Sequence, residues 1–262
     1  MVVLGGHEEA NGALLEAAQS FSTIDGYEAI VVDNGADVDK AFVAQPETRV
    51  SQVIKNGFNA GFARAANQGG KAAKGDYLLF LNPDISLTDK RALLRLLEVA
   101  EGTAGGGVFA PRLKGHSGED MPWGGYFHFR WSRLLSRIWP SMARPTLPKK
   151  GKVETDWVAA TAMLVSRQLW SSVDGFAEEY YMYFEDVDFC FRLKKENFPS
   201  FLVADAEIVH EGGGTYRQRP HERKLADYRV SRNTFFRKHA PLRGWLLQLL
   251  DLMAWGRYNR PQ

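Results

Sequence analysis

The amino-acid sequence predicts an α/β fold: a doubly wound, mostly parallel sheet flanked by helices, with a helical extension at the C-terminus. Three observations predict it. Short apolar segments of strand length alternate with helical patterns over the first half of the chain. Two of these segments run directly into polar residues, as the ligand-binding strand ends of such sheets do. The chain has 262 residues, of which 45% are hydrophobic and 24% charged, as expected for a globular protein.

The first half of the chain contains the expected strands and helices of a parallel sheet. In chain order they are a strand at 2–4, a helix around 13–19, strands at 29–32 and 50–54, a helix of small residues from 62, and a strand at 77–81. Strands separated by helices pair through crossovers, so this order favours parallel pairing. Asp33 and Asn34 follow the second strand, and Asn82 and Asp84 follow the fourth, which predicts a ligand site at these strand ends.

The second half of the chain is less regular. From 102 to 155 glycine, proline, aromatic and basic residues are frequent, which indicates a long excursion that forms a lid or a partner surface. An apolar strand is expected at 157–166, a further strand at 201–204, and helix between 221 and 257. We therefore expect a main domain over 1–215 and a basic, amphipathic helical extension over 216–262.

Composition excludes several classes of protein. The 33 Lys and Arg residues against 31 Asp and Glu residues leave a net charge of +2, too balanced for a surface devoted to nucleic acid. Cys190 is the single cysteine, so the fold contains no intrachain disulfide. The start of the chain lacks a signal-peptide pattern, and the apolar segment 245–255 is about half the roughly 20 residues that span a bilayer. We expect a cytoplasmic protein that binds no nucleic acid.

Asp84 and His210 are the candidate metal ligands. Asp84 follows an apolar strand and a proline, and His210 also ends a strand, beside a glycine run. A hard divalent cation that is bound to substrate phosphates needs only one or two protein carboxylates. The alternatives are that Asp84 caps a helix or forms an Asx-turn, and that His210 is a capping or core histidine.

Three carboxylates lie close together among aromatic residues: Glu185, Asp186 and Asp188. Crowded, partly buried carboxylates raise one another's proton affinity, so one of them is a candidate general base near neutral pH. The alternative is that they begin the helix that continues to Lys195, with Arg192 pairing with Asp188 four residues earlier. Both can hold, with Asp188 structural and Asp186 left for chemistry.

Taken together, these segments resemble the family 2 glycosyltransferases of the GT-A fold, in particular their bacterial rhamnosyltransferase-like branch. The resemblance covers most of residues 1–215. Its matching segments are VVDNGA around Asp33, NAGFARAANQG at 59–69, YLLFLNPDI around Asp84, DWVAATAMLVSR at 156–167, VDGFAEEYYMYFEDVDFCFRL at 173–193, and IVHEGGGT from Ile208.

The resemblance implies an inverting glycosyltransferase that moves a sugar from a UDP- or dTDP-sugar to a glycan or lipid-linked acceptor, in surface polysaccharide synthesis. Asp186 would be the catalytic base, with Glu185 the next candidate, and Asp84 and His210 would hold Mn²⁺ or Mg²⁺. The donor sugar would lie along Ala160 and Thr161. The residues implied in nucleotide binding are Asp33, Asn34, Asn59, Gly61, Arg64, Asn67 and Asn82. Residues 1–215 would then form the catalytic domain, with an acceptor-side excursion at 102–155.

The sequence departs from the family pattern at several positions. Asn82 replaces one carboxylate of the usual Asp-x-Asp pair, and Ala36 replaces the usual serine after the Asp-Asn pair. Ala160 and Thr161 stand where relatives have a Gly-Ala pair. These departures leave a second hypothesis open, namely a non-catalytic relative that binds a nucleotide sugar or a glycan.

The sequence of the C-terminal extension is consistent with two roles, packing on the main domain or contact with a membrane. Its basic cluster is Arg217, Arg219, Arg223, Lys224, Arg229, Arg232, Arg237 and Lys238. The cluster is either a solvated helix face or a surface for a diphosphate or an anionic acceptor. The apolar face at 245–255 either packs on the domain or lies in a membrane interface, as Trp and Arg at its borders favour. A peripheral membrane scaffold is therefore a third hypothesis.

Overall fold

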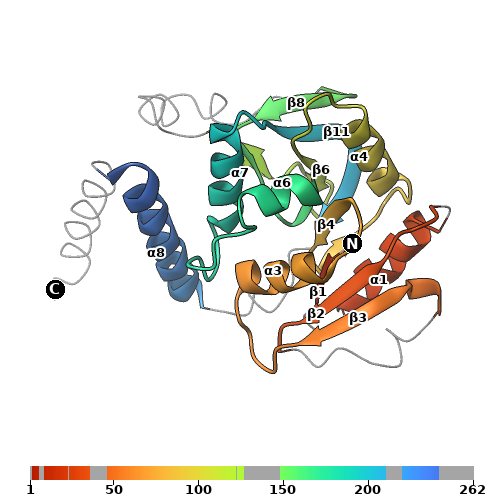
Figure 1. Ribbon diagram of the computed structural model, residues 1–262, viewed down its shortest axis with the longest axis horizontal. Coiled ribbons are helices and arrows are strands. Elements are labelled where there is room, and N and C mark those ends of the chain that lie inside the picture. The colour runs from red at the N-terminus through yellow and green to blue at the C-terminus, as the bar shows by residue number, and fades with distance from the viewer. Residues whose placement is uncertain are drawn as a thin grey trace.

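The computed structural model describes residues 2–5, 9–22, 24–35, 46–121, 123–126, 148–210 and 220–241 (Figure 1). The elements of the first half agree with the expected ones, except that the first helix begins at Glu9. They are β1 (Val2–Gly5), α1 (Glu9–Ser20), β2 (Ala29–Asp33), the short 3₁₀ helix η1 (Pro46–Thr48), β3 (Val50–Lys55), α3 (Phe62–Ala72) and β4 (Tyr77–Leu81).

The second half of the chain contributes the remaining elements. They are β5 (Ile85–Ser86), α4 (Ala92–Glu101), β6 (Val108–Lys114), β7 (Gly124–Gly125), β8 (Lys152–Thr155), β9 (Trp157–Val158), β10 (Ala162–Ser166), α6 (Arg167–Ser172), α7 (Glu185–Lys195), β11 (Ser200–His210) and α8 (His221–His239). The apolar run at 157–166 is thus two strands, since a turn at Ala160 and Thr161 separates β9 from β10.

A nine-stranded sheet organises the described residues, in the order β3-β2-β1-β4-β10-β6-β11-β5, with β8 also paired to β11. β3, β2, β1 and β4 are parallel, as the helical crossovers require. β10 is antiparallel to both β4 and β6, and β11 is parallel to β6. Six strands therefore run in one direction, against β5, β8 and β10, which confirms the predicted mostly parallel α/β fold.

The range 102–155 is not purely an excursion, which corrects the sequence interpretation. β6 lies within it and pairs with β10 and β11 inside the main sheet. Its sequence contains Pro111, which is paired with Val203 of β11. Proline lacks the N–H that a central strand donates, so the pattern argued against a strand there. β7 and β8 also lie within this range, and residues 122 and 127–147 of it lie outside the described residues.

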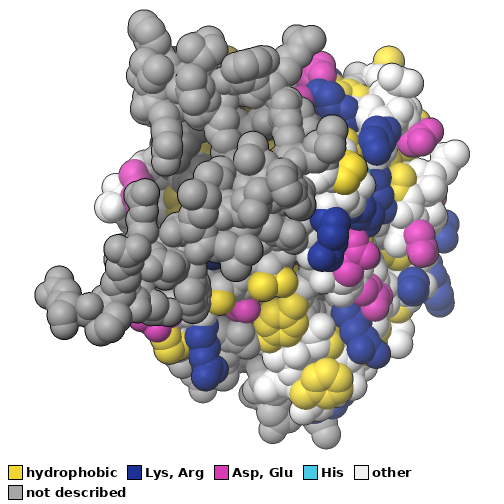
Figure 2. Space-filling view, turned by 90° about the vertical axis from the view of Figure 1, so that its left-hand side faces the viewer, with side chains coloured by type: hydrophobic (Ala, Val, Ile, Leu, Met, Phe, Trp, Pro, Cys, Tyr) yellow, Lys and Arg dark blue, Asp and Glu magenta, His cyan; other side chains and the backbone are white. Residues whose placement is uncertain are grey.

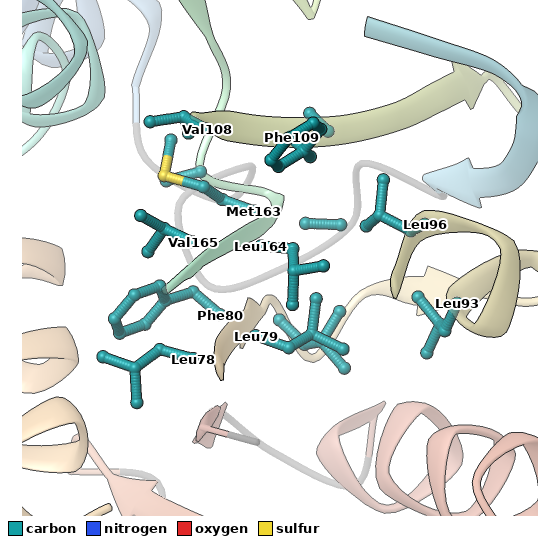
Figure 3. Close-up of a cluster of buried hydrophobic side chains, with 14 of the residues drawn as sticks. Leu78, Leu79, Phe80, Leu93, Leu96, Val108, Phe109, Met163, Leu164 and Val165 are labelled. Carbon is teal, nitrogen blue, oxygen red and sulfur yellow. The ribbon is translucent and has the colours of Figure 1, made fainter. Parts of the chain in front are cut away.

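The core lies on both faces of β4, β10 and β6 (Figure 3). Leu78 and Phe80 point to one side of β4, and Leu79 points to the other side, toward Leu93 and Leu96 of α4. On the first side the Phe80 ring lies 6.5 Å from that of Trp170 in α6. Because both faces of the strand are covered, its sequence is a continuous apolar run. Burying each such side chain contributes about 1.5–3 kcal/mol, and this core holds the strand ends that carry the site.

α8 packs against the segment around α7 through a second apolar cluster, made of Tyr180, Phe235 and Phe236. Figure 2 views the molecule from the side that carries α8. Lys and Arg side chains are interspersed with Asp and Glu side chains on the described part of this surface. Among the described residues, none of the helices has both the length and the apolarity to cross a bilayer. Arg217, Arg219 and the apolar segment 245–255 lie outside the described residues.

Candidate active site

The end of β2 and the loop that follows β3 form one hydrogen-bonded unit. Asn34 Oδ1 accepts hydrogen bonds from Ala60 N at 2.9 Å and from Asn56 Nδ2 at 3.1 Å. Asn34 Nδ2 donates to Gly61 O and to Asn59 Oδ1, each at 3.2 Å. The structure therefore brings Asn34, Asn59 and Gly61 together, and it uses the two asparagine side chains to shape the loop.

Asp33 lies beside this loop, at the last position of β2. Its side chain is buried, and Oδ2 lies 3.7 Å from Nζ of Lys55, its partner in the strand register. Lys55 is a charged neighbour that the sequence interpretation did not single out. A lysine at the end of a partly exposed strand such as β3 carries no sequence signal that it lies next to Asp33 at a ligand edge.

Gly61 holds a conformation and a position that only glycine fits. Its φ is 88°, and a Cβ there would lie 2.8 Å from the carbonyl oxygen of Tyr181. Phe62 N donates to that oxygen at 3.4 Å. The loop after β3 is therefore in direct contact with the segment that leads into α7.

Arg64 and Asn67 have different surroundings on α3. The Asn67 side chain is buried, donates to Phe176 O at 2.8 Å and to Glu178 Oε1 at 3.1 Å, and accepts from Phe176 N at 2.9 Å. These bonds occupy the amide, so its role in the structure is to tie α3 to the loop before α7. Arg64 lies on the exposed face of the helix.

The two candidate metal ligands lie side by side. β5 pairs with the end of β11, which places His210 opposite Ile85, next to Asp84. Asp84 Oδ2 and His210 Nε2 are 3.2 Å apart, and the two side chains are only 12% and 18% exposed. Asn82 N donates to Thr161 O at 2.9 Å, so this corner also adjoins the turn between β9 and β10.

An oxygen donor and a nitrogen donor at that separation fit a shared divalent cation, because two ligands of one small ion lie about 3 Å apart. No cluster of three or more His, Cys, Asp or Glu side chains suited to a metal ion occurs in the described part of the chain. A cation at Asp84 and His210 would therefore need further oxygen ligands from a substrate, and phosphate groups are the usual source.

Asp186 is held against the turn that carries Ala160. Its Oδ2 accepts a hydrogen bond from Ala160 N at 3.3 Å, and Oδ1 accepts one from Val187 N at 2.8 Å. Burial raises the pKa of Asp186 to about 6, and the backbone N–H bonds oppose part of that rise. The carboxylate can therefore accept a proton near neutral pH.

Glu185 precedes Asp186 and differs from it in environment. Its side chain is 7% exposed, and Oε2 is buried without a hydrogen-bond partner among the described residues. Burial, and secondly the neighbouring Asp186 charge, raise the pKa of Glu185 well above its ordinary value. Both adjacent carboxyl groups thus have raised pKa values, and the rise favours the protonated form of Glu185.

The backbone before these carboxylates is strained. Tyr183 has φ 67° and Phe184 has φ 69°, so two consecutive non-glycine residues adopt the left-handed conformation. Each such residue costs about 1–3 kcal/mol unless its surroundings hold it. Backbone strain of this kind clusters at functional sites, and here it lies directly before the first turn of α7.

Asp188 is a structural residue, as the sequence indicates. Its side chain is fully buried, and Oδ2 accepts from Arg192 Nε at 2.6 Å. Oδ1 accepts from Tyr180 Oη at 3.1 Å and lies 2.6 Å from Nε2 of His239 in α8. Burial would raise the pKa of Asp188, but His239, Arg192 and Lys238 lower it to about 2. The Arg192 partner is visible in the sequence, whereas His239 is brought in by tertiary packing.

A sequence model of the family described as Glycosyl transferase family 2 matches residues 11–169. An N-acetylglucosaminyl-diphospho-decaprenol L-rhamnosyltransferase of Mycobacterium tuberculosis is 24% identical over 261 residues, which cover 88% of this chain and 83% of that protein. The rhamnosyltransferase WbbL of Escherichia coli K12 is 26% identical over 224 residues, which cover 80% of this chain and 81% of WbbL.

Solved structures share the fold at lower identity. GalNAc-T7, solved with UDP, GalNAc and Mn²⁺, aligns with a TM-score of 0.61 at 12% identity over 90% of this chain, which spans 49% of that protein. The mannosyltransferase PcManGT of Pyrobaculum calidifontis, solved with GDP-Man and Mn²⁺, aligns with a TM-score of 0.54 at 14% identity. The alignment covers 88% of this chain and 59% of the PcManGT chain.

Proposed function

The chain belongs to glycosyl transferase family 2 and has the GT-A fold, and from this premise we propose that it transfers a sugar from a UDP- or dTDP-sugar to a hydroxyl of a glycan or lipid-linked acceptor, with inversion. One observation carries the proposal: the Asp186 carboxylate, with a pKa near 6, is held on the backbone of the Ala160 turn, beside the strand end that carries Asp84. Relatives named as rhamnosyltransferases support a role in surface polysaccharide synthesis.

In the proposed reaction Asp186 removes the proton from the acceptor hydroxyl. The acceptor oxygen then attacks the anomeric carbon from the face opposite the diphosphate. The bond from that carbon to the diphosphate oxygen breaks, and the electron pair leaves with the nucleoside diphosphate. A single displacement of this kind inverts the anomeric configuration. Asp33 and the loop shaped by Asn34 and Asn59 would bind the nucleotide, and Ala160 and Thr161 would line the donor sugar.

Asp84 and His210 would hold the divalent cation, Mn²⁺ or Mg²⁺. Bound there, such a cation would neutralise charge on the departing diphosphate. Asn82 lacks the second carboxylate of the usual motif, so His210 supplies the nearby second ligand in this chain. Relatives of the same fold were solved with Mn²⁺, which supports the assignment.

The direct test is release of nucleoside diphosphate. The protein would be incubated with a panel of UDP- and dTDP-sugars, including a rhamnose donor, with Mn²⁺ or Mg²⁺ and a lipid-linked N-acetylglucosamine acceptor. We expect acceptor-dependent release with one donor of the panel, and a product whose anomeric configuration is inverted by NMR. A product of retained configuration would contradict the in-line mechanism.

The rate should depend on pH through Asp186. The raised pKa of about 6 means that the base is protonated and inactive below that pH and ionised above it. We therefore expect kcat to rise with pH and to level off above about pH 7. A kcat profile measured from pH 4.5 to 8 at saturating donor and acceptor tests this. A kcat that falls over this interval would argue against a carboxylate base.

Removal of either metal ligand should weaken metal activation. In Asp84→Ala and in His210→Ala we expect the cation concentration for half-maximal rate to rise about tenfold or more, because each variant loses one of the two adjacent ligands. Titration of the chelator-treated enzyme with Mn²⁺ measures it. Asp89→Ala is the control, because it removes a nearby aspartate that forms an exposed ion pair with Arg95. Full activity of the wild type in excess chelator would contradict a metal role.

We also propose that the enzyme is cytoplasmic and docks on the inner face of a membrane to reach a lipid-linked acceptor. The support is in the sequence: the basic cluster from Arg217 to Lys238 precedes the apolar segment 245–255. Arginines near anionic lipid headgroups contribute about 1 kcal/mol each, and salt weakens this attraction. Insertion of the apolar segment would resist salt, so we expect the full chain to cosediment with anionic liposomes at low salt and in part at high salt, and a chain that ends before Pro241 to lose the salt-resistant part. A full chain that stays in the supernatant at low salt would favour a soluble acceptor.

A further inference from the structure

We propose that α8 is a positioning element for the catalytic base, and that Ser231 and Tyr228 act by holding the strained segment 182–184 that aims Asp186. This inference rests on the proposed function, because it presumes that Asp186 is the base. Neither residue touches Asp186, so both are positioning residues.

The segment 182–184 needs to be held from outside. Tyr183 and Phe184 are both left-handed, and the Phe184 side chain, at the N-cap of α7, makes no capping hydrogen bond. Upstream of them, the contact of Tyr181 O with Phe62 N is long, at 3.4 Å. Without further contacts the two residues would relax toward ordinary φ values, which would turn the first turn of α7 and carry Asp186 away from Ala160.

α8 supplies these contacts. Ser231 is buried, and its Oγ donates to the carbonyl oxygen of Met182 at 2.7 Å. The Tyr228 ring lies 5.8 Å from the ring of Tyr183 and 5.3 Å from that of Phe184. Three consecutive residues before the two carboxylates are thus each in contact with one face of α8, and these are the residues whose backbone is strained or adjoins the strain.

The far end of α8 is anchored on α7 itself, and Phe235 there also lies 5.5 Å from the ring of Phe184. His239 Nε2 lies 2.6 Å from Asp188 Oδ1, and Phe235 packs 5.6 Å from Phe191 on the same side of α7. With α8 fixed on α7 at that end, the contacts of Ser231 and Tyr228 have a rigid support. Removing one of them should loosen the segment without detaching the helix.

The test compares matched variants on this helix. Ser231→Ala and Tyr228→Ala should each lower kcat about tenfold, with the KM for the donor changed by less than about twofold, because the base is displaced while the Asn34 hydrogen bonds that shape the nucleotide loop remain. Tyr228→Phe keeps the ring, and Thr234→Ala removes a hydroxyl that accepts a hydrogen bond from Arg237 within α8 at 3.5 Å, so both variants should retain wild-type kcat. Circular dichroism melts ensure that every variant is assayed folded.

A double-mutant cycle separates positioning from general loosening. In the Asp186→Asn background, Ser231→Ala should lower the residual rate by less than about twofold, because there is no base left to position. The inference is overturned if Ser231→Ala and Tyr228→Ala keep wild-type kcat, or if they cost about tenfold again in that background. The proposed function fails separately, if the wild-type protein releases no nucleoside diphosphate or if Asp186→Asn is fully active.

Discussion

Asp186→Asn is expected to lower kcat by about 10²- to 10⁴-fold, the usual contribution of a general base. The amide is nearly isosteric, and its oxygen can still accept the hydrogen bond from Ala160 N or Val187 N, so the side chain should keep its place. What it loses is the capacity to take the acceptor's proton. The affinity for the donor should stay within about twofold, since the nucleotide loop is untouched.

Steady-state assays of nucleoside diphosphate release measure kcat. Isothermal titration calorimetry with a non-hydrolysable donor analogue measures the affinity for the donor. Glu185→Gln is the matched control, because it makes the same chemical change at the neighbouring position, where burial and the Asp186 charge favour the protonated form of the carboxyl group. We expect it to have the smaller effect on kcat. If Asp186→Asn retained normal turnover and Glu185→Gln did not, Glu185 would be the base.

Asp188→Ala is expected to lower the free energy of unfolding by about 3–5 kcal/mol, as is typical when one partner of a buried ion pair is removed. The carboxylate is fully buried, and Arg192, Tyr180 and His239 all point to it. Their polar groups would be left without this acceptor in a region that excludes water. Urea denaturation followed by circular dichroism measures the loss.

Asp120→Ala is the matched control for this prediction. Asp120 also has a pKa lowered to about 2, through its pairs with Arg112 and Lys114, but its side chain is 46% exposed. Solvent screening limits exposed pairs to roughly 0–1 kcal/mol, so this variant should lose far less stability. Equal losses of stability in Asp188→Ala and Asp120→Ala would mean that burial does not decide the strength of the Asp188 network.

The stabilising contribution of Asp188 should also depend on pH. Because the folded pKa of Asp188 is about 2, below the ordinary value, its contribution is present above about pH 4 and is lost as the pH falls toward 2.

The first four strands could be predicted from the sequence within one residue at their ends. For β2 and β4 the reason is that a strand buried along its length is a continuous apolar run. β6 could not be predicted, since Pro111 interrupts the pattern of a central strand. The sequence predicts a single strand at 157–166, where the structure has β9 and β10. The turn between them consists of the small residues Ala160 and Thr161, which do not interrupt the apolar pattern. Local pattern therefore predicts elements well where burial is uniform along them.

The sequence by itself determined the fold class, the family and the chemical identity of the candidate groups, because alternation of elements and the order of short motifs are local properties of a chain. It also determined the pairing of Asp188 with Arg192, one helical turn away. Only the tertiary structure decided which groups are neighbours. The pairing of β5 with β11 brings Asp84 to His210, the turn after β9 brings Ala160 to Asp186, and α8 brings Ser231 to Met182. The physical reason is that spacing along the chain reports contacts within a helical turn or a strand, whereas these contacts arise from strand pairing and core burial between distant segments.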